Sequence, residues 1–173
     1  MENQLERIKS KLIERLRENS DGEEEVYLET LPIEKITEFE NKYQIKLPQG
    51  IVDFYTKVSN GAVLYPDEKI CNLDPFENWH FDKNSIHTDF NIENDVTYDD
   101  YCDIKKSTKD YSFESCGNIE LMYLGCAMTY NIVVKGKHYG EIIALLEMYL
   151  EITNKNFLEW IEGCIDGTEE YML

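Results

Sequence analysis

The sequence predicts an α+β fold, a single domain spanning residues 1–173 in which helices pack on an antiparallel-type sheet. Three observations support this prediction. Apolar residues recur at three- and four-residue spacing in the first third of the chain, strand-like runs follow residue 117, and a helical pattern closes the sequence. With 173 residues, 42% of them hydrophobic, the chain has enough apolar side chains for one core.

The first helix is predicted within residues 1–19. Its apolar positions, which charged residues separate, are Leu5, Ile8, Leu12 and Leu16. The segment 20–25, Ser-Asp-Gly-Glu-Glu-Glu, ends the helix and indicates a solvated loop. Residues 1–29 are therefore predicted to form an N-terminal helix and an acidic loop.

Two shorter helices are predicted next, and each begins with a proline. Proline is common in the first turn of a helix, where the N–H that it lacks has no intrahelical partner. One helix follows Pro32, and the other follows Pro48 and ends at Asn60-Gly61. Their apolar faces comprise Ile33, Ile36, Phe39 and Tyr43 in the first helix and Ile51, Phe54, Tyr55 and Val58 in the second.

The middle of the chain, residues 62–115, is acidic and rich in aromatic residues. Between residues 66 and 115 it holds 13 acids and five lysines. Asn, Asp, Ser and Thr interrupt it throughout, which predicts short strands joined by long loops. In one interpretation the aromatic residues only anchor these loops on the core. In the other they form an interaction surface with the acids, because tyrosine and tryptophan supply rigid contact area.

A clearer strand pattern begins at residue 117. The predicted strands are 119–124, 130–134 and 138–145, with a tight turn at 135–137. Asn154 is predicted to cap a closing helix. The apolar residues of that helix are Phe157, Leu158, Trp160, Ile161 and Ile165.

The chain is strongly acidic. Lys and Arg number 17 against 35 Asp and Glu, which gives a net charge of −18, and the pI is about 4.4. A field of this sign repels phosphate backbones and attracts basic proteins, so direct nucleic-acid binding is not expected. Solubility alone is the alternative explanation of the acidity.

The sequence predicts a cytoplasmic protein. The five cysteines follow no disulfide or metal-binding spacing, and the first residues lack the apolar core of a signal peptide. No apolar run is long enough to cross a membrane, so no membrane partner is expected. We expect the cysteines to be reduced and mostly buried.

The sequence contains no recognisable pattern for a metal, cofactor or catalytic site. Cys-x-x-Cys, His-Glu-x-x-His, Gly-x-Ser-x-Gly and phosphate-binding loops are all absent from it. His80 and His87 lie seven positions apart among acids, which chance explains better than a metal site. A cysteine paired with His87 or His138 stays open as a hydrolase alternative. We expect no metal, no cofactor and no enzyme activity.

One part of the chain resembles a known family. The segment from Pro32 to Pro48, Pro-Ile-Glu-Lys-Ile-Thr-Glu-Phe-Glu-Asn-Lys-Tyr-Gln-Ile-Lys-Leu-Pro, with Phe54 and Asn60-Gly61 after it, resembles the opening of a SUKH (SMI/KNR-like) domain. Residues 117–125, with Phe157 and Trp160, are similar to the family's sheet and closing helix. The resemblance covers most of residues 30–166. It departs from the family where Ala62 replaces a frequent second glycine.

The resemblance implies a non-catalytic binding module. Bacterial members of the family are typically immunity proteins that block toxins, and eukaryotic relatives regulate cell-wall synthesis through protein contacts. The expected function is binding and neutralisation of a cognate, basic, nuclease-type toxin, and the alternative is a regulatory scaffold with no toxin partner. In either case the expected contacts are with proteins.

The acidic, aromatic middle is the predicted contact region. Its acids would steer a basic partner, and its tyrosine and tryptophan residues would supply the main contact area. The predicted partner-binding residues are Asp67, Glu68, Asp74, Glu77, Trp79, Asp82, Asp89, Asp95, Tyr98, Asp99, Asp100 and Tyr101.

Overall fold

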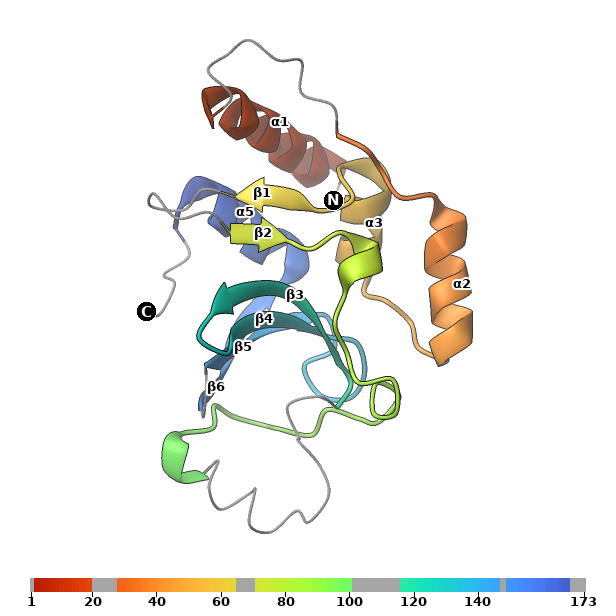
Figure 1. Ribbon diagram of the computed structural model, residues 1–173, viewed down its shortest axis with the longest axis vertical. Coiled ribbons are helices and arrows are strands. Elements are labelled where there is room, and N and C mark those ends of the chain that lie inside the picture. The colour runs from red at the N-terminus through yellow and green to blue at the C-terminus, as the bar shows by residue number, and fades with distance from the viewer. Residues whose placement is uncertain (1, 20–27, 65–70, 101–115, 147–148, 169–173) are drawn as a thin grey trace.

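The computed structural model describes residues 2–19, 28–64, 71–100, 116–146 and 149–168. Six strands of these residues form one antiparallel sheet, and helices cover one of its faces (Figure 1). The α+β class, with N-terminal helices and one C-terminal helix beside the sheet, is confirmed.

The sheet is a meander, since each strand pairs with the next one along the chain. The helices are α1 (Glu2–Asn19), α2 (Ile33–Tyr43), α3 (Gln49–Lys57) and α5 (Phe157–Asp166), with a short 3₁₀ helix, η1 (Phe76–Asn78). The strands are β1 (Ala62–Leu64), β2 (Cys71–Leu73), β3 (Asn118–Gly125), β4 (Met128–Val133), β5 (Glu141–Leu146) and β6 (Tyr149–Asn156). Their order in the sheet is β1-β2-β3-β4-β5-β6.

The main core lies between the helices and one face of the sheet. The predicted apolar residues of α1 pack there, with Leu5, Ile8 and Leu12 all buried. The ring of Trp160 on α5 lies 5.2 Å from that of Tyr130 on β4, which joins the closing helix to the sheet. The predicted apolar faces of α1 and α5 are therefore confirmed. On α2 the prediction for Ile33 is wrong, since that residue is 49% exposed, while Ile36, Phe39 and Tyr43 do pack against the core.

A smaller core lies on the other face of the sheet. There the segment 90–97 crosses β4, β5 and β6. The buried members of this small core are Phe90, Val96, Val133, Ile143, Leu150 and Ile152. The acidic middle is thus anchored on the sheet in its described part, and it covers the strands nearest β6.

The closing helix begins later than predicted. Its N-cap is Asn156, whose side chain accepts hydrogen bonds from the backbone N–H groups of Leu158 and Glu159. Glu159 in turn accepts from the Asn156 N–H, which completes a capping box. The prediction that Asn154 caps this helix is wrong, because the chain continues as β6 as far as Asn156.

Two other predicted boundaries differ from the structure. α3 ends at Lys57, so Gly61, with φ of 94°, serves the turn into β1 and is not the helix terminus. β5 begins at Glu141, because His138 and Gly140 have positive φ and extend the turn. Backbone angles of this kind cannot be read from hydrophobic periodicity alone.

An ion-pair network joins α1 to α5. Glu162 accepts hydrogen bonds from Arg7 Nε at 2.5 Å and from Lys11 Nζ at 2.8 Å. The hydrogen bond from Arg7 is the main cause that lowers the pKa of Glu162 to about 2; that from Lys11 adds to it, while burial opposes it. The network therefore adds a pH-dependent contribution to the docking of α1.

Replacing Glu162 with glutamine is expected to lower the free energy of unfolding at pH 7 by about 1 kcal/mol. A carboxyl whose pKa is lower in the folded state stabilises the fold above its unfolded pKa, and this contribution disappears as pH falls toward the folded value. The difference between the two proteins should therefore shrink between about pH 5 and pH 2. Urea unfolding across this range measures it, and a difference independent of pH would contradict the assignment.

No helix within the described residues is long and apolar enough to cross a membrane.

Candidate protein-interaction surface

The described acidic segment, residues 73–100, is fastened along the sheet by backbone hydrogen bonds. It carries eight carboxylates and one lysine. The Asp74 N–H donates to the Leu121 carbonyl at 2.8 Å at one end. Val96 exchanges two backbone hydrogen bonds with Leu150 at the other. The segment is therefore held against the sheet at both of its ends.

Trp79 belongs to the main core. Its side chain is 7% exposed, and its ring lies 5.9 Å from that of Phe39 on α2. Its indole N–H donates to the Tyr55 hydroxyl at 3.2 Å, and that hydroxyl donates to the Asp74 carbonyl at 2.6 Å. Trp79 therefore offers little ring surface to a partner, since most of its side chain is covered by the core.

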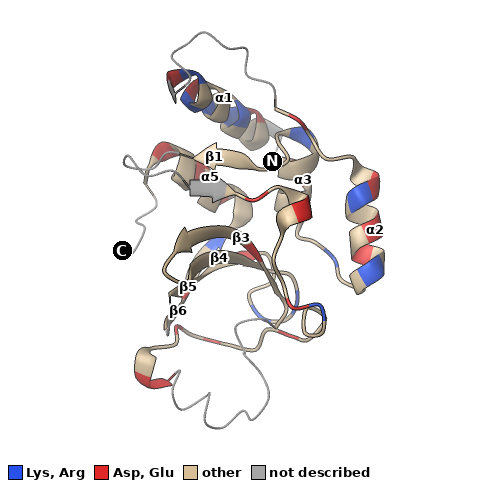
Figure 2. Ribbon diagram, viewed as in Figure 1, with Lys and Arg blue, Asp and Glu red and all other residues tan. Residues whose placement is uncertain are grey.

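The predicted acids fall into separate groups. Asp74, Glu77 and Asp82 lie near η1 and β3, where the Glu120 N–H donates to the His80 carbonyl at 2.8 Å. Figure 2 shows acidic residues, in red, on the short helix before β3 and, separately, on the helical turn near β6. Asp82 is exposed, and its carboxylate accepts from the Asn84 N–H at 2.9 Å, a bond that lowers its pKa.

A second group lies beside β6. Asp95, Tyr98, Asp99 and Asp100 are exposed there, and Tyr98 is 57% exposed. β3 and β6 are three strand steps apart, which is about 14 Å at the usual strand spacing. An ordinary interface of about 800 Å² per partner is about 30 Å across, so one partner could touch both groups.

The remaining predicted residues do not join either group. Asp89 lies between them and faces Lys135, with 3.7 Å from Oδ1 to Nζ. Asp67, Glu68 and Tyr101 lie outside the described residues.

A third set of residues lies on the sheet face away from the helices, over β1 to β3. Glu120 and His80 are bridge partners there, and Tyr123 and Val63 point to the same face, 57% and 38% exposed. We call Asp74, His80, Glu120, Tyr123 and Val63 the open-face cluster. The open-face cluster brings exposed apolar area next to carboxylates.

The carboxyls of the open-face cluster are partly buried. Burial is the main cause that raises the pKa of Asp74, and the charge of His80 opposes it. Burial likewise raises the pKa of Glu120, and the neighbouring Asp74 raises it further. The cost of desolvating these carboxyls would fall if a cation came near them.

Sequence reasoning missed Glu120, Tyr123 and Val63. All three lie on strands whose neighbouring residues are apolar, so they appeared to be ordinary strand positions. Side chains alternate between the two faces of a sheet, so the sequence of β3 could have indicated which residues point away from the core. A bulge between Glu120 and Met122 shifts this alternation, however.

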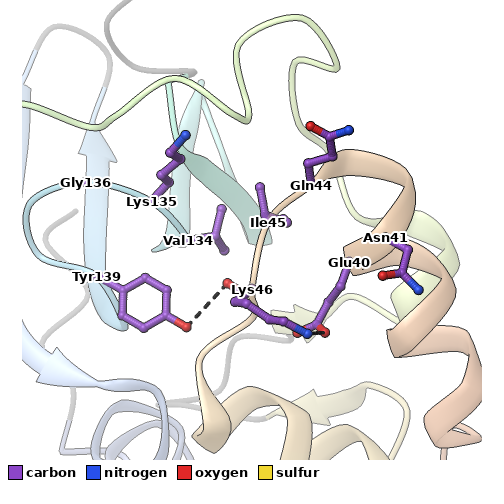
Figure 3. Close-up of a pocket in the computed structure, with 9 residues that line it drawn as sticks. All are labelled: Glu40, Asn41, Gln44, Ile45, Lys46, Val134, Lys135, Gly136 and Tyr139. Carbon is purple, nitrogen blue, oxygen red and sulfur yellow. Dashed lines mark hydrogen bonds and ion pairs between the residues drawn. The ribbon is translucent and has the colours of Figure 1, made fainter.

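A groove of about 530 Å³ lies between the α2–α3 connection and the turn before β5 (Figure 3). The Tyr139 hydroxyl bridges it by donating to the Lys46 carbonyl at 3.4 Å. Lys46 Nζ pairs with Glu40 at 2.5 Å, and Lys135 donates to the His87 carbonyl at 2.6 Å. Both lysines of the groove therefore already have partners within the chain.

His, Cys, Asp and Glu side chains are the candidates for metal binding and for thiol chemistry. Within the described residues, no group of three or more His, Cys, Asp or Glu side chains is placed to hold a metal ion. The described cysteines include Cys116 and Cys164, which are buried, and Cys126, which is exposed. Burial raises the pKa of Cys116, whereas a nucleophilic thiol requires a lowered one.

Comparison of the chain with family models, with curated proteins and with solved structures found no match to any of them.

Proposed function

We propose that this protein is a non-catalytic binding module that neutralises a basic protein partner, as bacterial immunity proteins do with a cognate toxin. The observation that carries the proposal is the strip of eight carboxylates against one lysine in residues 73–100, which backbone hydrogen bonds hold on the sheet. An acidic surface of this kind speeds encounter with a basic protein and selects against acidic ones.

The resemblance to SUKH domains supports a toxin as the partner. A nuclease-type toxin presents a basic cleft for phosphate, and an acidic protein competes with the substrate for that cleft. We place the contact at the open-face cluster, because Tyr123 and Val63 supply apolar area beside Asp74 and Glu120. Interfaces derive most of their affinity from such an aromatic centre, while surrounding charges set the partner.

The proposal is tested by capturing the partner from native cells and expressing it alone. We expect the captured protein to be basic and toxic, and co-expression of this chain to restore growth. A captured partner that is harmless alone would contradict the immunity role and favour the regulatory scaffold.

Two double variants with the same change in charge locate the contact. Replacing Asp74 with asparagine and Glu120 with glutamine is expected to lower the association rate about threefold and to speed dissociation about tenfold or more. Replacing Asp99 and Asp100 with asparagine should change only the association rate, since these residues lie beside β6. Binding kinetics at two salt concentrations measure both rates. Equal dissociation rates for the two variants would remove the open-face cluster from the interface.

A further inference from the structure

The two edge strands of the sheet differ in how readily another chain could pair with them. A strand edge carries unpaired backbone N–H and C=O groups to which another chain can add, and long, regular edge strands are the most exposed to this. β1 is three residues long, whereas β6 has eight. β6 is therefore the edge at which addition of another strand would be most favourable.

Only the first half of β6 is regular. Leu150 pairs with Leu145, and Ile152 pairs with Ile143. After Ile152 the register with β5 shifts, and Asn154 has a φ of 54°. A bulge of this kind bends a strand and interrupts pairing, so residues 153–156 are a poor template for another strand. The template that remains is residues 149–152.

Every outward backbone group of Leu150 and Ile152 already has a partner. The Leu150 N–H donates to the Val96 carbonyl at 3.0 Å, and the Val96 N–H donates to the Leu150 carbonyl at 2.8 Å. The Ile152 N–H donates to Asp95 Oδ1 at 2.8 Å. The Asn154 side-chain amide donates to the Ile152 carbonyl at 3.0 Å. These four bonds use one backbone residue and two side chains.

We propose that Asp95, Val96 and Asn154 form an edge cap that prevents a second copy of this chain from adding to β6. Val96 already pairs with Leu150 in the antiparallel pattern that an added strand would use. A second copy is the relevant occupant because two copies of residues 149–152 can pair antiparallel about a two-fold axis. The cap is anchored, since Val96 is 4% exposed and packs in the small core.

The edge cap gives Asp95 a role within the chain. The sequence predicted Asp95 as a partner-binding residue, but its carboxylate accepts the hydrogen bond of an edge amide. Tyr98, Asp99 and Asp100 follow shortly after Val96 in the chain and are exposed. The inference does not depend on the proposed toxin partner.

Alanine and asparagine at position 95 separate the cap from simple charge repulsion. Both variants remove one negative charge, but asparagine keeps an oxygen that can accept from the Ile152 N–H. In Asp95→Ala we expect the Ile152 amide to exchange with deuterium about five- to tenfold faster. We also expect a concentration-dependent dimer in sedimentation velocity, because the unpaired Ile152 N–H lets a second copy compete with Val96 for the edge. Asp95→Asn should stay monomeric, with exchange close to that of the parent protein.

Three results would overturn the cap. One is an unchanged exchange rate at Ile152 in Asp95→Ala, and another is a monomer at every concentration despite faster exchange. The third is dimerisation of both variants, which would show that charge keeps the copies apart. Far-ultraviolet circular dichroism verifies that each variant is folded. Should Asp95→Ala unfold, Asp95→Ser, with a shorter acceptor, replaces it in the same comparison.

Discussion

Alanine in place of Trp160 is expected to lower the free energy of unfolding by about 3–5 kcal/mol. Trp160 is fully buried, with 0% of its surface exposed, and it is among the largest fully buried side chains. Its ring lies 5.2 Å from that of Tyr130 and 6.0 Å from that of Phe157. Truncation would leave a cavity where α5 meets the sheet, so urea denaturation should show a large drop in stability.

Phenylalanine at the same position is the matched control. The indole N–H of Trp160 is buried and has no hydrogen-bond partner among the described residues. Phenylalanine removes this N–H, whose burial without a partner costs about 1–3 kcal/mol, while it keeps most of the apolar contact. We therefore expect Trp160→Phe to lower the free energy of unfolding by about 1 kcal/mol or less, because removal of the unpaired N–H offsets the loss of ring volume. If Trp160→Phe destabilises the protein as much as Trp160→Ala does, ring volume is not the cause.

Alanine in place of Gly136 is the second change with a large expected effect, about 3–5 kcal/mol of destabilisation. A Cβ on Gly136 would lie 2.5 Å from both the N and the O of Phe90. Both are backbone atoms that already form hydrogen bonds. The Phe90 N–H donates to the Lys135 carbonyl, and the Phe90 carbonyl accepts from the Lys137 N–H. The added methyl group would therefore separate residue 90 from the turn and loosen the small core.

Gly125 provides a control for backbone strain. Gly125 and Gly136 both have φ of 93°, so alanine is disfavoured conformationally at both positions. A Cβ on Gly125 meets no atom within 4 Å, so Gly125→Ala is expected to cost only about 1 kcal/mol. Comparing the thermal unfolding of the two variants separates the steric contact with Phe90 from the backbone strain that both positions share. Equal losses would show that the contact with Phe90 is unimportant.

Local pattern was enough to predict several elements of the fold. Helical spacing predicted α1, α2 and α3 because each buries one apolar stripe, a property of consecutive residues. The strands β3, β4 and β5 were predicted in order, with boundaries that differ by a few residues. β6 was not predicted, because the polar residues of 151–156 mask its apolar positions.

The candidate site was predicted only in part, for a physical reason. The sequence located the acidic segment, and Asp74 belongs to the open-face cluster. Exposure of a given ring depends on which neighbours cover it, so the sequence did not reveal that Trp79 is buried and Tyr123 is exposed. The bulge in β3 adds to this difficulty, since one extra residue reverses the face of those that follow.

The sequence by itself determined the charge of this protein, its helices and its α+β class, because these follow from composition and from periodicity over short stretches. Only the tertiary structure decided which acids face a partner and which serve the fold. Asp95 and Asp99 are both acids of the same segment, yet one accepts the amide of Ile152 and the other lies exposed beside β6. That difference depends on a strand more than 50 residues later in the chain, and no local pattern encodes contact at such a separation.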